Sequence, residues 1–342
     1  MTPHTFFSAA ARTLFAVTAL GIAVAGARAA ATMQEPWWAW GFNTAPSTEV
    51  SSAPPPAPRP DTTILLHVEG SKASFTRAQI IDSYGPADWF PDDHPPMPDI
   101  VAHGRKAAAP PITACALCHL PNGNGRPENA NLTGFTYDYI LQQLQDFRAG
   151  ARRTSDPRKT NTGLMSGFTR SMTDEEMEAA ATYFASLPAK SSSKVIESKM
   201  VPRTRPSGGL FIAIKGDKAT EPLGDRIVEG PMDEEQTETL RNPRIRFIAY
   251  VPPGSLAKGE ILVRTGNGKV TPCTACHGAD LRGLGPVPRL AGNSPVYLVR
   301  QLYDMQSGHR TGKWTPLMGP VVAGLNAEDM LAAAAYLGSL RP

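Results

Sequence analysis

The chain has 342 residues, which is more than one small domain needs and leaves room for two compact domains with extensions. Its 33 prolines and 30 glycines are many for a packed α/β enzyme, so we expect short helices joined by irregular chain. The formal net charge of +3 falls to about +1 when a leader carrying Arg12 and Arg28 is removed. The charge therefore gives no support to binding of nucleic acid or of a membrane surface.

Residues 1–31 have the pattern of a secretory signal peptide. Arg12 precedes an apolar run from Leu14 to Ala27, and small residues suited to cleavage follow it. Because the run is short for a bilayer span, we expect cleavage and a periplasmic location, with no membrane span left in the mature chain. An uncleaved leader that anchors the protein to the membrane is the alternative. Residues 32–60 are then a proline-rich tether that favours polyproline II.

Residues 61–105 form an expected ordered extension. Thr63 to Val68 has the alternation of a strand, and Thr76 is a suitable cap for a short helix from Arg77 to Asp82. A metal site is a minor alternative here, because prolines separate its candidate ligands and no helical pairing is present. Those candidates are His94, His103, Asp92, Asp93 and Asp99. The favoured interpretation is a strip packed on the domain that follows.

Two identical Cys-x-x-Cys-His strings stand at residues 115–119 and 273–277, and together they use all the cysteines of the chain. In this motif the two thiols attach covalently to a c-type haem, and the adjacent histidine becomes the proximal ligand of the iron. A redox dithiol or half of a zinc site is the competing use of a lone Cys-x-x-Cys pair. The repetition, with histidine following each pair, favours two haems. The predicted attachment residues are Cys115, Cys118, Cys273 and Cys276, and the predicted proximal ligands are His119 and His277.

The two motifs belong to an internal repeat. A constant offset of 158 residues also superimposes Gly125 on Gly283, Tyr139 on Tyr297 and Gln143 on Gln301. Tyr139 to Arg148 and Tyr297 to Gln306 have apolar residues at helical spacing, and each is followed by a glycine suited to a C-terminal cap. The two halves are therefore predicted to share a fold.

A methionine recurs in both copies at an offset of 153, where Met165 superimposes on Met318. Each is expected in a loop before a capped helix, from which the thioether reaches the haem face opposite the histidine. Met165 and Met318 are therefore the predicted sixth ligands. Met172 is the competing candidate in the first copy, but it superimposes on Leu325, where packing explains an apolar side chain.

Two further details of the haem sites are expected. Arg152 and Arg310 coincide in the repeat and are candidates for contact with haem propionates. Pro127 and Pro286 follow the motifs at a distance that suits a carbonyl acceptor for the proximal imidazole, although they are not equivalent in the repeat.

Each half resembles a class I cytochrome c domain, on the strength of Cys-x-x-Cys-His, a Tyr-x-x-x-Gln-Leu helix, a methionine loop and a final Tyr-x-x-Ser-Leu. The tandem is similar to the dihaem cytochromes of the c4 group. The resemblance covers residues 106–190 and 256–342, and it implies a mainly α fold with two tandem domains, His/Met ligation and one-electron transfer outside the cytoplasm. The N-terminal extension and residues 191–255 depart from it, and that middle segment is expected to be irregular, with short strands at Leu210 to Lys215 and Ile245 to Val251.

The ligand set favours an electron carrier over an enzyme. A haem with histidine on one face and methionine on the other is coordinatively saturated, so it offers no site for a substrate. The expected partners are redox proteins that donate or accept electrons. Two alternatives stay open: a dihaem enzyme with a labile ligand at the first haem, where the loop before Met165 is longer, and a dedicated cytochrome subunit of a periplasmic dehydrogenase.

Overall fold

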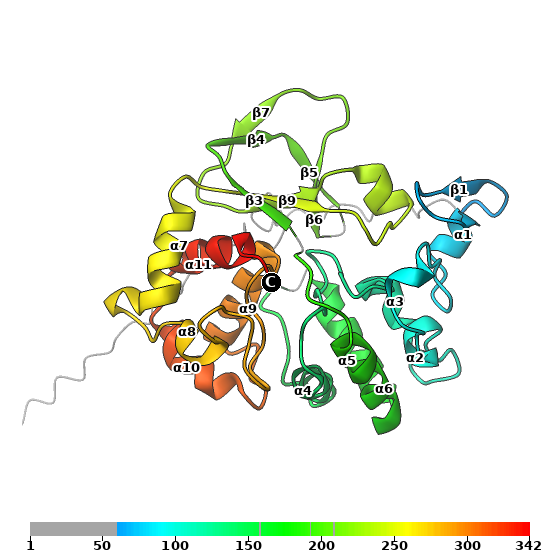
Figure 1. The fold of residues 1–342 in the computed structure, drawn as a ribbon, viewed down its shortest axis with the longest axis horizontal. Helices are drawn as coiled ribbons and strands as arrows, with labels where there is room; N and C mark the ends of the chain where they lie inside the picture. Colours follow the sequence, from blue (N-terminus) through cyan, green and yellow to red (C-terminus); the bar gives the residue numbers. More distant parts are fainter. Residues whose placement is uncertain (1–59, 157–158, 192, 208) are drawn as a thin grey trace, which may run out of the picture. The chain divides into compact units, whose positions relative to one another are not determined.

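The computed structural model describes residues 60–342, except residues 157–158, 192 and 208. The expected signal peptide and the proline-rich tether before Pro60 lie outside the described residues. Within the described part, helices form two groups. Most strands lie in the chain between these groups, and one strand pair precedes the first group (Figure 1). This confirms the predicted fold class, a mainly α chain with two tandem domains of one kind joined by a segment with short strands.

The helices are α1 (Arg77–Ile80), α2 (Asp99–Ala102), α3 (Cys115–His119), α4 (Tyr137–Arg148), α5 (Thr160–Ser171), α6 (Asp174–Ala185), α7 (Ser255–Thr265), α8 (Thr274–His277), α9 (Pro295–Gln306), α10 (Thr315–Ala323) and α11 (Ala327–Ser339). Short helical turns are η2 (Pro91–Asp93), η3 (Glu235–Thr239) and η4 (Gly266–Gly268). The strands are β1 (Leu65–His67), β2 (Ser74–Thr76), β3 (Ser193–Glu197), β4 (Met200–Pro202), β5 (Thr204–Ser207), β6 (Leu210–Ala213), β7 (Thr220–Pro222), β8 (Val228–Pro231) and β9 (Phe247–Val251).

The helices of the two groups correspond in pairs, α3 with α8, α4 with α9, α5 with α10 and α6 with α11. Helices α4 and α9 begin and end at equivalent positions, and their first turns are capped by the hydroxyls of Thr136 and Ser294. Both are followed by a glycine in the left-handed conformation, Gly150 at φ +69° and Gly308 at φ +75°. The hydroxyl that caps the start of the helix and the glycine that follows its end are thus present in both copies.

Helices α6 and α11 begin with complete capping boxes. The Thr173 hydroxyl accepts from the Glu176 N–H while the Glu176 carboxylate accepts from the Thr173 N–H, and Asn326 and Asp329 do the same. Each helix then buries its apolar face in the core of its own group. The expected starts of these helices are therefore present in the structure.

The two copies differ at the helix that precedes the haem motif. In the second copy, α7 packs lengthwise on α11, and Gly259 makes this possible because a Cβ there would lie 2.0 Å from the Ala332 carbonyl oxygen. In the first copy the equivalent helix is α2, which is a single turn. The prolines at 95, 96 and 98 remove backbone donors just before α2, so a longer helix is not available.

The middle segment contains more strand than the sequence indicates. Strands β3 and β9 pair in parallel, β8 pairs antiparallel with β9, and two further antiparallel pairs are β4 with β7 and β5 with β6. Ile227, Ala249 and Val251 are fully buried in the core of the second helix group. On the other side, Asn122 Nδ2 donates to the Pro243 carbonyl at 2.8 Å. The middle segment therefore contacts both helix groups.

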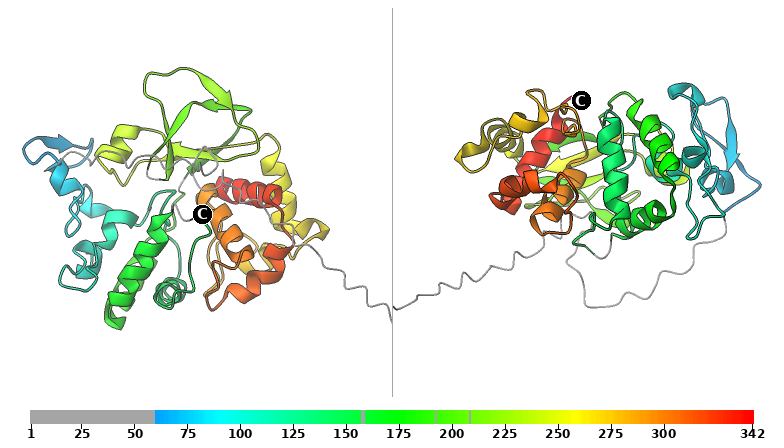
Figure 2. Two further views of the ribbon diagram at one scale, coloured as in Figure 1. Left: turned by 180° about the vertical axis from the view of Figure 1, so that it is seen from behind. Right: turned by 90° about the horizontal axis from the view of Figure 1, so that it is seen from below.

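Backbone contacts between the two helix groups repeat across their interface. Figure 2 shows the ribbon of these groups from two further sides. The Arg153 N–H donates to the His309 carbonyl at 2.8 Å, and the Thr311 N–H, which is equivalent to that of Arg153, donates to the Ala151 carbonyl at 2.7 Å. Between them, Arg152 and Arg310 form an antiparallel bridge. Residues that stand 158 positions apart in the sequence therefore make equivalent contacts from opposite sides of the interface. This is the pattern of an isologous contact.

Candidate haem-binding sites

A cavity of about 340 Å³ lies against the first haem motif. The thiols of Cys115 and Cys118 and the ring of His119 line it on one side. Its walls are largely apolar and come from α4, α5, α6 and the residues next to them; they include Phe135, Tyr139, Ile140, Leu144, Phe147, Met165, Phe168, Met172, Ala180 and Phe184. The cavity therefore brings together the three residues that the first motif predicts as haem-binding and the predicted sixth ligand, Met165.

Both histidines predicted as proximal ligands are oriented by a backbone carbonyl. Nδ1 of His119 lies 3.0 Å from the Ala130 oxygen, and Nδ1 of His277 lies 2.8 Å from the Pro288 oxygen. A carbonyl only accepts, so Nδ1 carries the proton and Nε2 is left with a free lone pair. Burial lowers the pKa of both imidazoles, which favours the neutral form that a metal ligand requires.

The sequence led us to expect the carbonyls of Pro127 and Pro286 as the acceptors for the two imidazoles. This expectation is wrong, because the acceptors belong to Ala130 and Pro288. Ala130 and Pro288 stand at the repeat offset of 158, whereas Pro127 and Pro286 do not, so the repeat itself contains the signal for these acceptors. The physical reason is that the accepting group belongs to the backbone, which any residue provides.

All four cysteines carry free thiols. Burial raises the pKa of Cys115 to about 12 and that of Cys273 to about 11, so both thiols are neutral in this folded chain. No disulfide forms between the neighbouring thiols of either pair. The thiols are thus available for thioether bonds.

Both predicted methionine ligands lie on helices and not in loops. Met165 is in α5 and Met318 is in α10, where each side chain is partly buried. Pro316 lies in the first turn of α10, a position where proline is compatible with a helix because that N–H has no partner in the helix. The expectation of a loop at these two positions is therefore wrong, because both segments form helices.

The competing methionine lines the same cavity as Met165. Met172 is the C-cap residue that directly follows α5, and it is 7 % exposed within the apolar core of the first copy. Its repeat counterpart Leu325 is also buried, at 6 % exposure. Equivalent burial of an apolar side chain in both copies supports packing as the role of this position.

The polar end of the cavity is closed by side chains of both helix groups. Arg152 comes from the first copy, and Tyr297, Arg300, Gln301 and Asp304 come from α9 of the second. Arg152 Nη2 donates to Gln301 Oε1 at 2.8 Å. Arg310 donates across the interface to Tyr139 and Gln143. Both arginines named for propionate contact therefore lie at the interface, and Arg152 also lines the cavity.

The chemistry of these residues fits a covalently bound haem c. Apolar walls suit the porphyrin faces, two thiols stand beside the histidine whose Nε2 is free, and basic side chains lie at one end where propionates need counter-charges. The second copy repeats the motif and the carbonyl-bonded histidine.

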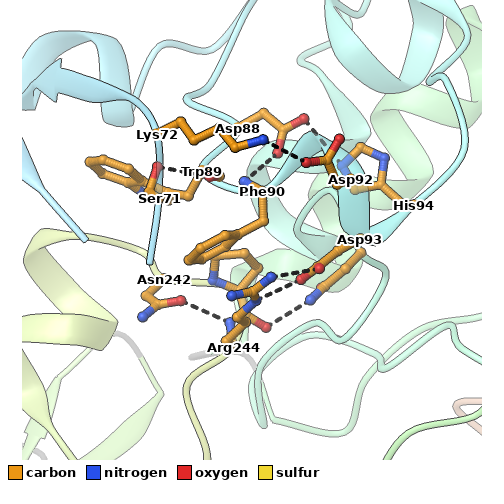
Figure 3. A network of polar contacts seen from close by, with 12 residues as sticks. Ser71, Lys72, Asp88, Trp89, Phe90, Asp92, Asp93, His94, Asn242 and Arg244 are labelled. Carbon is orange, nitrogen blue, oxygen red and sulfur yellow. Dashed lines mark hydrogen bonds and ion pairs between the residues drawn. The ribbon is translucent and has the colours of Figure 1, made fainter. Parts of the chain in front are cut away.

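Several acidic side chains and one histidine of the N-terminal extension form polar contacts (Figure 3). His94 Nε2 lies 3.1 Å from Asp88 Oδ2, and its Nδ1 lies 2.9 Å from the Pro95 carbonyl. Arg244 of the middle segment donates twice to Asp93, at 2.7 and 2.6 Å, and lies over the Phe90 ring. Within the described residues, no group of three or more His, Cys, Asp or Glu is arranged to hold a metal ion.

No helix in the described part of the chain is long and apolar enough to cross a membrane.

Comparison with known proteins finds similarity to cytochromes c. The family model Cytochrome c matches residues 101–188. Cytochrome c-554(548) of Halomonas halodenitrificans is 41 % identical over 75 residues, which cover 22 % of this chain and 90 % of that protein. The thiosulfate dehydrogenase electron acceptor of Stutzerimonas stutzeri is 28 % identical over 236 residues, covering 68 % of this chain and 82 % of that protein. Cytochrome c4 of Azotobacter vinelandii is 25 % identical over 247 residues, covering 71 % and 89 %. Among solved structures, reduced cytochrome c4 from Pseudomonas stutzeri aligns with a TM-score of 0.43 at 23 % identity, covering 66 % of this chain and 93 % of that one.

Proposed function

Because the chain belongs to the cytochrome c family, we propose that it transfers single electrons between redox proteins through two covalently bound haems c. The first haem is attached at Cys115 and Cys118 and the second at Cys273 and Cys276. The observation that carries this proposal is the first cavity, where two thiols, a neutral histidine and Met165 line one apolar space. The repeated motif and repeated histidine contact support a second haem.

The axial ligands we propose are His119 with Met165, and His277 with Met318. A bound haem supplies a reversible one-electron couple, and a thioether ligand favours its reduced state. The chain's own residues hold the geometry fixed and exclude water: the carbonyls of Ala130 and Pro288 orient the imidazoles, and the helix core surrounds the first cavity. With a protein ligand on each face, neither haem offers a place for a substrate.

We place this activity in the periplasm. The N-terminal pattern of a signal peptide supports export, and an uncleaved leader would keep the protein at the membrane facing the same compartment.

A dehydrogenase is the partner we favour. A thiosulfate dehydrogenase electron acceptor is similar over 68 % of this chain, and the cytochrome subunit of a sulfide dehydrogenase from Chlorobaculum tepidum is 32 % identical over 90 residues. These similarities support a role as the electron-accepting cytochrome of such an enzyme. The N-terminal extension and the middle segment then provide surface for a fixed partner.

Carbon monoxide binding distinguishes the carrier from an enzyme. A pyridine haemochrome assay of the purified holoprotein is expected to give two haems per chain, and stopped-flow mixing of the reduced protein with carbon monoxide should show no rapid phase, because both irons are saturated. Peroxide turnover should be negligible in the same preparation. Rapid binding to one haem per chain that is lost in Cys115→Ala/Cys118→Ala, but retained in Cys273→Ala/Cys276→Ala, would instead identify the first haem as catalytic.

A further inference from the structure

Arg300 reaches from the second helix group into the first cavity. It lies on α9, is 6 % exposed, and its Nη2 donates to the Pro127 carbonyl of the first copy at 2.8 Å. Its other terminal nitrogen, Nη1, is buried and has no hydrogen-bond partner. A buried guanidinium normally has its donors satisfied, so the orphaned nitrogen indicates a missing acceptor at the edge of this cavity.

The nearby carboxylates are already engaged elsewhere. Asp304, one turn along α9, accepts from the N–H and the hydroxyl of Ser155 at 2.9 and 2.8 Å. Glu229 accepts from Ser294 and from the Val296 N–H at the start of α9. Glu128, which also lines the cavity, pairs with Arg126 at 2.6 Å through Oε1, and its Oε2 has no hydrogen-bond partner. Within the described residues, Arg300 forms no salt bridge with any of these three carboxylates. An anionic group from outside the chain would therefore supply the missing acceptor.

The repeat shows that this cation is present on one side only. The residue equivalent to Arg300 in the first copy is Gln142, which is uncharged and donates to Asp146 at 2.8 Å. Arg152 and Arg310, by contrast, occupy equivalent positions and are present in both copies. Arg300 thus breaks the charge symmetry of an interface whose backbone contacts are reciprocal.

We propose that Arg300 binds a propionate carboxylate of the haem attached at Cys115 and Cys118. Its positive charge raises the reduction potential of this haem. This inference rests on the proposed function. Guanidinium and carboxylate form strong charge-assisted hydrogen bonds, and Arg300 lines the same cavity as the first haem motif. Oxidation adds a positive charge to the haem, so a buried cation nearby favours the reduced state. The second haem receives no equivalent contribution, because Gln142 is neutral.

The test is Arg300→Gln, which introduces the residue that the first copy carries at the equivalent position. In the full-length holoprotein, a redox titration followed by NMR of the haem methyl groups measures each potential separately. The reduction equilibrium constant of the first haem should fall about tenfold, a shift of about 59 mV for a one-electron couple, while the second haem is unchanged. Arg341→Gln is the matched control, since it removes the same charge from an exposed position outside the cavity.

Several outcomes overturn the proposal. An unshifted first haem, or an equal shift at both haems, would show that Arg300 does not act on the first propionate. If Arg300→Gln does not fold, Arg300→Met keeps the side-chain volume without the charge and is judged by the same shift. A chain that binds no haem at the first motif would contradict the proposed function itself, and the pyridine haemochrome count separates that failure from an unshifted potential.

Discussion

At the scale of single residues, the position of the His119 imidazole depends on one close backbone approach. Gly125 has φ +58°, and a Cβ there would lie 2.1 Å from the Ala130 oxygen, the atom that accepts from His119. Its N–H also donates to the His119 carbonyl at 2.9 Å. Gly283 repeats this bond to His277 in the second copy. Glycine is therefore required where the loop returns to orient the histidine.

The identity of the sixth ligand is testable at Met165. Met165→Ala should remove about half of the far-red methionine-to-iron absorbance of the oxidised protein and lower the potential of the first haem, because a soft thioether stabilises the reduced iron. Absorbance spectroscopy and a redox titration of the holoprotein measure both effects.

Met172→Leu is the control for this substitution. Leu is the residue of the second copy at this position and fits an apolar core, so the absorbance band should persist and stability should change by less than about 1.5 kcal/mol. Loss of the band in Met172→Leu, with the band intact in Met165→Ala, would assign the ligand to Met172 instead.

At the scale of elements, a buried carboxylate joins the middle segment to α9. Glu229 of β8 is 1 % exposed and accepts from the Ser193 hydroxyl of β3, from the Ser294 hydroxyl at 2.7 Å and from the Val296 N–H at 3.0 Å. Burial raises its pKa above the usual 4.5, while these hydrogen bonds oppose the shift. The start of α9 is thus connected to the strands of the middle segment through one acidic side chain.

This carboxylate predicts a pH dependence of stability. Since the folded pKa is raised, the unfolded state loses its proton first, so the stabilising contribution is complete below about pH 4.5 and is lost as the pH rises through the folded pKa. The free energy of unfolding of the unsubstituted protein, relative to Glu229→Gln, should therefore decrease from pH 4.5 upward. Denaturant unfolding of the holoprotein across this range measures it. Glu178→Gln, at an exposed position of α6, should show no such trend, and a constant difference for Glu229→Gln would contradict the assignment.

The elements differ in how far the sequence predicts them. The capped helices α4, α6, α9 and α11 were predictable, because apolar spacing and side-chain caps act within a few residues. The haem motifs were predictable for the same reason, since their chemistry depends on adjacent residues. Helix α5 was missed because its polar first turn has no side-chain cap and its later residues gain stability only by packing on the core. The strand pairing of β3 with β9 joins residues more than fifty positions apart, which local patterns do not encode.

At the scale of the whole described chain, the repeat determines the interface as well as the helices. The Ser155 N–H donates to Asp304, and the equivalent Lys313 N–H donates to Asp146 at 3.3 Å. These contacts add to the bridge between Arg152 and Arg310. The middle segment contributes to the second core and also bonds to Asn122 of the first copy. Each helix group therefore depends on residues outside itself for part of its packing.

This mutual dependence predicts that the two helix groups unfold as one cooperative unit. Arg310 donates to Gln301, Tyr139 and Gln143 at 2.9, 3.2 and 2.9 Å, so its guanidinium connects the two groups at the centre of the interface. Arg310→Met keeps a long apolar stem and leaves these acceptors without their donor, which should lower the free energy of unfolding by about 1–3 kcal/mol. Arg341→Met, at an exposed position, should leave the free energy of unfolding unchanged.

Far-ultraviolet circular dichroism and haem absorbance should follow one coincident transition in the unsubstituted holoprotein, because no part of the packing is independent of the interface. Two separate transitions, together with no loss of stability in Arg310→Met, would show that each group folds alone and that the reciprocal contacts only position them.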